Sequence, residues 1–159
     1  MAGLRKLLLV AAALIGATTM VPTVRAATAP ADPCSLLTAA DVSKSMGQTY
    51  GAPEKTVAPR PYANSVQGTD CHYTSATGSG ALLFRIYFDP SAADATTLFA
   101  KLKMFYSPPT PVPGIGDETY FDPHHGLHVR KGNVRFFLNL GDNTDSQLKA
   151  LASLIVGRV

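Results

Sequence analysis

Apolar and polar side chains alternate most regularly between residues 81 and 89, where the sequence is ALLFRIYFD. Side chains on an extended strand point in turn to opposite faces, so alternate residues share one face of a sheet. On one face of this segment every side chain is large and apolar: Leu82, Phe84, Ile86 and Phe88. The segment CHYT at 71–74 precedes it across the glycine-rich SATGSG. The pattern predicts a β-hairpin whose second strand faces the core.

Three other segments have helical spacing. The first follows Thr38, which has an aspartate three residues later as in a capping box, and it ends at Gly47. The second begins at Ser91 and must end before SPPTPVPGIG at 107–116, because proline cannot donate the backbone hydrogen bond that a helix requires. The third follows Thr144 and carries one apolar stripe: Leu148, Leu151, Ala152 and Ile155. We therefore predict three helices, with a turn before the first.

The other apolar segments predict strands joined by short turns. ETYFD at 118–122, GLHVRK at 126–131 and NVRFFLNL at 133–140 are rich in β-branched and aromatic residues, and Gly132-Asn133 is a typical tight-turn dipeptide. Residues 48–70 include several prolines and have no sustained periodicity, which predicts a long surface loop. Short turns favour antiparallel pairing. The predicted class is α+β, with an antiparallel sheet of about five strands, helices packed on it and the order α-β-β-α-β-β-β-α.

The first 26 residues have the pattern of a secretory signal peptide. Two basic residues precede an apolar run from Leu7 to Ile15, and the predicted cleavage site follows Ala26. The run is about half as long as the ~20 residues that a membrane-spanning helix needs. Cleavage leaves a short tail at 27–31 and a single α+β domain at 32–159. We expect an exported protein, periplasmic or extracellular, with no membrane span in the mature chain.

The net positive charge of the chain comes from this leader, so it does not indicate an anionic partner once the leader is removed. The whole chain has 14 basic and 11 acidic residues. Three of the basic residues lie in the leader, namely Arg5, Lys6 and Arg25, so the mature chain is formally neutral. Binding to nucleic acid depends on basic side chains that neutralise phosphates. The mature chain therefore gives no argument for a nucleic acid or an anionic membrane as partner.

Both cysteines, Cys34 and Cys71, remain after cleavage, and an even count in an exported chain predicts a disulfide. Closing a loop of this length stabilises a fold by about 4 kcal/mol in the chain-entropy model. His72 is next to Cys71, but neighbours on a strand point to opposite faces, which argues against a cysteine–histidine nucleophile. Cys34 follows Asp32-Pro33 rather than the small residues of a lipobox, so we expect no lipid anchor.

The segment DPCSLLTAADV at 32–42 resembles the opening motif of a family of small exported proteins and lipoproteins of unknown function, common in actinobacteria. Three further pieces fit this family: Cys-x-Tyr at 71–73, GIGDE at 114–118 and the strand pair around LHVRKGN. Together the matching pieces span nearly the whole mature chain. The resemblance implies an exported α+β domain in which Cys34 and Cys71 are paired. It implies no activity, cofactor or catalytic residue.

The segment DPHHGLH at 122–128 is the strongest candidate for chemistry. Its candidate metal ligands are His124, His125, His128 and Asp122. Zinc and copper take neutral imidazoles that converge on the ion, usually as three or four ligands, but the established spacings such as HExxH are absent. A simple four-residue turn from Pro123 to Gly126 is the alternative. A metal site would require His124 or His125 to fold back towards His128.

The last hairpin places two like charges together. With a two-residue turn at Gly132-Asn133, Arg130 faces Arg135 across the strand pair. Like charges in that position are destabilising unless something compensates them. We expect acidic side chains to do so, with Asp117, Glu118 and Asp122 as the candidates. The alternative is a contact of the two arginines with an anion or a partner.

No nucleophile with a matching base is evident in the sequence. The Gly-x-Gly of GIGDE lacks the strand before it and the helix after it that a nucleotide-binding loop requires, so a turn is the simpler interpretation. We therefore expect a non-enzymatic domain without a cofactor, which binds a protein, an envelope component or a small molecule through its loops and exposed sheet face. The alternatives are a metal-binding protein that uses the His-rich hairpin and a hydrolase without an identifiable motif.

Overall fold

The computed structural model describes residues 26–78, 80–140 and 144–159. After a short 3-10 helix, its elements follow in the order α-β-β-β-α-β-β-β-β-α. Their bounds are η1 Pro33–Leu36, α1 Ala39–Met46, β1 Glu54–Ala58, β2 Gly68–Thr74, β3 Ala81–Phe88, α2 Ala92–Phe105, β4 Thr110–Pro111, β5 Glu118–Phe121, β6 Leu127–Lys131, β7 Val134–Asn139 and α3 Asp145–Val156. The predicted α+β class is confirmed. The predicted signal peptide at 1–26 lies outside the described residues, apart from Ala26.

In the described part of the chain, seven strands form one antiparallel sheet in the order β1-β2-β3-β7-β6-β5-β4. The prediction of about five strands is therefore wrong, because it lacked the two outermost strands. Strand β1 lies in the segment predicted as a loop, and four of its five side chains are exposed, so no alternating pattern marks it. Strand β4 contains Pro111, which is tolerated because an edge strand need not donate on its outer side.

The first two predicted helices have the predicted caps, whereas Thr144 precedes α3 without the predicted side-chain cap hydrogen bond. At α1 the hydroxyl oxygen of Thr38 accepts a hydrogen bond from the backbone N–H of Asp41 at 3.1 Å, and Asp41 accepts one from the N–H of Thr38 at 2.9 Å. This reciprocal pair is a capping box. Gly47 ends the helix with a φ of +67°, a left-handed conformation that glycine adopts at little cost. At α2 the hydroxyl oxygen of Ser91 accepts a hydrogen bond from the N–H of Asp94 at 3.1 Å, without the reciprocal bond.

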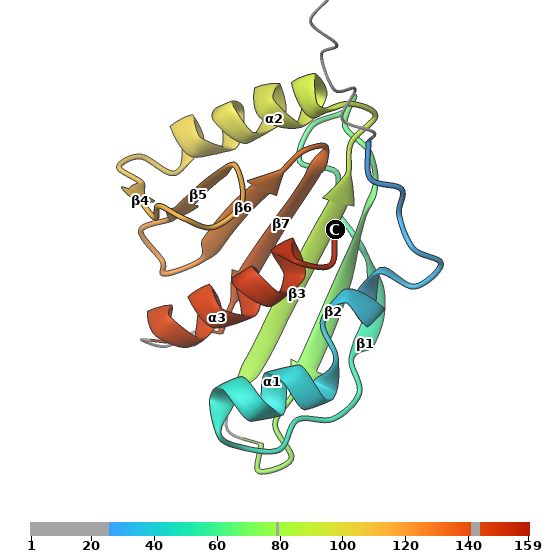
Figure 1. Ribbon diagram of the computed structural model, residues 1–159, viewed down its shortest axis with the longest axis vertical. Coiled ribbons are helices and arrows are strands. Elements are labelled where there is room, and N and C mark those ends of the chain that lie inside the picture. The colour runs from blue at the N-terminus through green and yellow to red at the C-terminus, as the bar shows by residue number, and fades with distance from the viewer. Residues whose placement is uncertain (1–25, 79, 141–143) are drawn as a thin grey trace, which may run out of the picture.

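One face of the sheet forms the main core together with α1, α3 and η1, which lie across it in Figure 1. The predicted stripe of α3 is buried there: Leu148, Leu151, Ala152 and Ile155. The apolar face of β3 meets this stripe, and Phe84 and Phe136 pack edge to face with ring centroids 6.1 Å apart. Helix α2 lies on the opposite face, where Phe99 contacts Tyr120 at 5.2 Å between centroids.

The predicted disulfide joins Cys34 in η1 to Cys71 in β2, with Cα atoms 5.7 Å apart. Tyr73, two residues after Cys71, points to the same face and its hydroxyl donates a hydrogen bond to the carbonyl oxygen of Leu37. His72 between them is exposed, as expected from strand alternation. The Cys-x-Tyr motif therefore fastens the N-terminal segment to the sheet. Among the described helices, none has the length and hydropathy to cross a membrane.

Candidate functional site

The segment DPHHGLH forms the turn between β5 and β6, and Asp122 organises it. One carboxylate oxygen of Asp122 accepts hydrogen bonds from the backbone N–H groups of His124 at 2.8 Å and Gly126 at 2.9 Å. His125 has a φ of +60°, so a histidine rather than Gly126 adopts the left-handed conformation of this turn. The turn interpretation of Pro123 to Gly126 is thus confirmed, with the carboxylate as its centre.

Gly126 is required for a different reason, because there is no room for a side chain at this position. A Cβ atom there would collide with the Phe137 ring and would lie 2.6 Å from the second carboxylate oxygen of Asp122. The close approach brings the turn onto the sheet face. It also holds Asp122 beside His128, the first polar residue of the outgoing strand.

His128 is buried in a stack of aromatic rings. Its imidazole is nearly parallel to the Tyr120 ring, with centroids 4.7 Å apart, and it also contacts Phe137 at 4.6 Å and Tyr106 at 5.1 Å. Its Nε2 atom lies 3.0 Å from the Asp122 carboxylate. Both side chains are almost fully covered, with exposed fractions of 8% for His128 and 4% for Asp122. The ring and its carboxylate therefore form a fixed pair.

The predicted metal ligands do not converge in the described residues. His124 and His125 are exposed, and the Nδ1 atom of His125 lies 3.4 Å from Asp145 in α3 rather than beside His128. No group of three or more histidine, cysteine, aspartate or glutamate side chains in the described chain is placed to hold a metal ion. The metal-binding hypothesis therefore stays a prediction without geometric support.

The Asp122–His128 pair has a consequence for pH. Burial alone would raise the pKa of Asp122, but the hydrogen bonds from His128, Gly126 and His124 outweigh it and hold this pKa below its ordinary value. The stability that follows from this shift is present above the unfolded pKa of about 3.9 and is lost as the pH falls through the folded pKa. We expect Asp122→Asn to flatten the acid limb of stability, measured by urea unfolding between about pH 5 and pH 2.

Glu54→Gln is the control for this experiment, because it removes one carboxylate from the exposed part of β1. Its unfolding free energy should follow the wild-type curve through the acid range. Equal acid dependence in Asp122→Asn and the wild type would refute the proposed role of this pair.

The two arginines of the last hairpin face each other as predicted. Arg130 lies 3.1 Å from the Asp117 carboxylate, while Arg135 donates from Nε at 2.5 Å and Nη2 at 3.0 Å to Asp89. Acidic side chains therefore accompany both arginines. Asp89, however, was not among the expected carboxylates, because it follows β3 and not the neighbouring segment. A contact with an anion or a partner stays a prediction for both.

Beside the His128 stack, the sheet face is hollowed into a cavity of about 320 Å³, called here the aromatic cavity. It lies between the end of α2, the segment 59–62 and strands β3, β6 and β7. Its lining residues are mostly apolar or aromatic: Pro59, Pro61, Tyr62, Arg85, Tyr87, Leu102, Phe105, Tyr106, His128 and Phe137. The opening is marked by Phe105, whose side chain is 79% exposed. This cavity is the candidate functional site.

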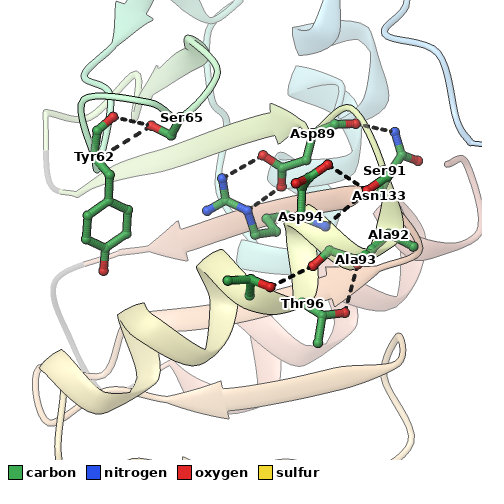
Figure 2. Close-up of polar contacts among 11 residues, drawn as sticks. Tyr62, Ser65, Asp89, Ser91, Ala92, Ala93, Asp94, Thr96 and Asn133 are labelled. Atoms are coloured by element: carbon green, nitrogen blue, oxygen red, sulfur yellow. Dashed lines mark hydrogen bonds and ion pairs between the residues drawn. The ribbon is translucent and has the colours of Figure 1, made fainter.

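The walls of the aromatic cavity are held in place by hydrogen bonds behind them. Figure 2 shows Ser65 bonded to the backbone of Tyr62, with its hydroxyl 2.7 Å from the Tyr62 carbonyl oxygen. The hydroxyl of Tyr87 donates to the carbonyl oxygen of Pro59 at 2.8 Å, which ties segment 59–62 to β3. The cavity is therefore largely formed before any ligand arrives.

Arg85 supplies the charged group of this wall. Its Nε and Nη2 atoms each lie 2.7 Å from an oxygen of Asp70, the residue opposite it on β2. The Asp70 side chain is 6% exposed and that of Arg85 is 28% exposed, so the carboxylate lies deeper than the guanidinium. The hydrogen bond that Arg85 donates to Asp70 raises the pKa of Arg85, although burial opposes this shift, and the side chain stays charged.

Sequence reasoning placed only His128 in this site. Arg85 and Tyr87 alternate in the sequence with the apolar residues of β3, so they lie on its other face. That alternation was the available indication of the cavity wall. Tyr62 and Tyr106 gave no such indication, because they reach the cavity from an irregular segment and from the end of a helix.

The fold and the site together define a disulfide-bonded α+β domain with an aromatic cavity on the sheet face opposite its main core. No protein-family model and no curated protein matches the chain. Among solved structures, the extracellular domain of PknH from Mycobacterium tuberculosis is similar, with a TM-score of 0.49 and 15% identity over 78% of this chain and 92% of that one. A similarity of this level says nothing about function, and membership in the exported family stays a prediction.

Proposed function

We propose that this protein is a non-enzymatic binding domain that holds a small ring-containing molecule in the aromatic cavity. The observation that carries the proposal is the convergence of six rings from separate parts of the chain: Tyr62, Tyr87, Phe105, Tyr106, His128 and Phe137. A volume of about 320 Å³ is at the lower end of the range for small-molecule sites. Of the partners considered from the sequence, a small molecule therefore has the most support.

The composition of the cavity supports binding rather than chemistry. Such sites are mainly apolar, with a few polar groups that orient the ligand. The polar groups here are Arg85, His128 and tyrosine hydroxyls, and none of the ten lining residues is a serine, threonine, cysteine or lysine. Apart from the tyrosines and His128, whose Nε2 atom is already 3.0 Å from the Asp122 carboxylate, the lining offers no nucleophile. The hydrolase alternative therefore gains no support from the cavity.

The disulfide is typical of proteins located outside the cytoplasm. We further propose, from the sequence, that the mature chain is exported and carries no lipid anchor.

Benzamide is a suitable first probe, because it combines one aromatic ring with an uncharged polar group. We expect it to bind in the millimolar range or tighter, as an efficient small ligand of this size does. In a two-dimensional NMR titration, the shifted backbone amides should be those of Arg85, Tyr87, Tyr106 and Phe137. Tyr106→Ala should weaken binding about threefold to tenfold through the loss of one ring contact.

Leu154→Ala is the matched control, because Leu154 is a 42% exposed apolar residue on α3, which lies on the other face of the sheet. It should leave benzamide binding unchanged. Shifts scattered over the surface, or equal binding to Tyr106→Ala and the wild type, would contradict a ligand site in the aromatic cavity.

A further inference from the structure

We infer that the ligand of the aromatic cavity carries a carboxylate, and that Arg85 binds it while the aromatic rings hold its ring. This inference rests on the proposed function, since it concerns the same cavity. Three observations support it: the charges of the lining residues, the N–H donors of Arg85 that Asp70 does not use, and the burial of Asp70.

A cationic ligand does not fit the lining. None of the ten lining residues is acidic, and one of them is a permanently charged arginine. Two of the tyrosine rings already have a cation nearby from the protein itself. The Nζ atom of Lys101 lies 5.6 Å from the centre of the Tyr62 ring, and the guanidinium of Arg135 lies 4.9 Å from that of Tyr87. A bound ammonium group would therefore find no carboxylate among the lining residues to pair with, and these two cations already lie against the rings that could hold it.

Arg85 retains the donors that a carboxylate requires. A guanidinium has five N–H donors in one plane, and Asp70 accepts one from Nε and one from Nη2. A further side-chain hydrogen bond joins Arg85 to Tyr87, so at least two N–H donors remain for a ligand. A carboxylate has the planar, two-oxygen geometry that matches this group, and hydrogen bonds between two ionised groups are about twice as strong as neutral ones.

The Asp70–Arg85 pair is neutral as a whole, but its two charges lie at different depths. Asp70 lies beside Arg85 on the neighbouring strand, is less exposed and does not line the cavity, whereas Arg85 does. The pair therefore acts as a dipole whose positive end faces the ligand. The same hydrogen bonds fix the guanidinium, so the cavity loses little side-chain entropy when a carboxylate binds.

Three probes of similar size, each with one aromatic ring but different charge, test this inference: benzoate, benzamide and benzylammonium. In NMR titrations of the mature protein, we expect benzoate to bind about fivefold to tenfold more tightly than benzamide, because its hydrogen bonds to Arg85 are charge-assisted. Benzylammonium should bind more weakly than benzamide. The preference for benzoate should decrease as the salt concentration increases.

The variant for this test is the double substitution Asp70→Asn with Arg85→Gln, which removes both charges and leaves no buried carboxylate unpaired. It should lose the preference for benzoate, so that benzoate binds this variant no more tightly than benzamide does. The matched control is Asp117→Asn with Arg130→Gln, a second aspartate–arginine pair on this sheet that does not line the cavity. The control should keep the preference.

The outcomes separate this inference from the proposed function. Benzamide binding in the cavity without a preference for benzoate would overturn the carboxylate inference and leave the proposed function in place. A preference for benzylammonium would overturn it equally. Failure of all three probes to bind would refute both. Because the ranking of the probes on the wild type decides the matter, the test does not depend on the folding of a variant.

Discussion

Replacing Asp89 by alanine should lower the free energy of unfolding by about 3–5 kcal/mol, because it leaves the buried guanidinium of Arg135 without its counter-charge. The exposed fractions are 2% for the Arg135 side chain and 0% for that of Asp89. The loss should be visible as a lower midpoint in urea unfolding followed by circular dichroism. Asp89 also joins the ends of β3 and β7 through its backbone, which bonds to Asn133 at 2.9 Å (Figure 2).

The control for Asp89→Ala is Glu118→Gln, which removes an ion pair with Lys103 whose side chains are 34% and 36% exposed. An exposed pair of this kind contributes about 0–1 kcal/mol. The double variant Asp89→Ala with Arg135→Met should regain most of the lost stability, because it removes the unpaired charge as well. If Asp89→Ala is no less stable than Glu118→Gln, the buried pair does not stabilise the fold as expected.

Removing the disulfide should cost about 4 kcal/mol, through the greater entropy of an unfolded chain whose loop is no longer closed. The bond joins residues 37 positions apart, and both cysteines are buried. The variant Cys34→Ala with Cys71→Ala should therefore unfold at a much lower urea concentration. Because the chain has no tryptophan, tyrosine fluorescence is the optical measurement for this transition.

His72→Ala is the control for the disulfide variant, since His72 is an exposed neighbour of Cys71 on the same strand. Its unfolding midpoint should match that of the wild type. A double cysteine variant with an unchanged midpoint would show that η1 is held by other contacts, such as the Tyr73 hydrogen bond to Leu37.

Local patterns predicted the elements that have a buried apolar face or a capped end. The alternation in β3, the stripe of α3 and the caps Thr38 and Ser91 all depend on residues within a few positions of one another. The register of the last hairpin was predicted for the same reason, because a two-residue turn fixes which residues face each other.

The sequence did not predict β1, because edge strands obtain their structure from a neighbour. The side chains from Glu54 to Val57 are exposed on both sides of the sheet, so no hydrophobic pattern distinguishes them from a loop. Their pairing with β2 depends on a strand that begins ten or more residues later. The partner of Arg135 was missed likewise, since Asp89 lies 46 positions away.

The sequence by itself determined the α+β class, the disulfide, the buried faces of most elements and the turn at DPHHGLH. These features depend on local spacing, or on the presence of only two cysteines in the chain. The tertiary structure alone decided the candidate site, which changed from the metal ligands of that turn to the aromatic cavity. Its walls come from four regions that are distant in sequence, the loop at 59–62, β3, the end of α2 and the strands β6 and β7. These regions are close together because of the strand order, which no local sequence pattern indicates.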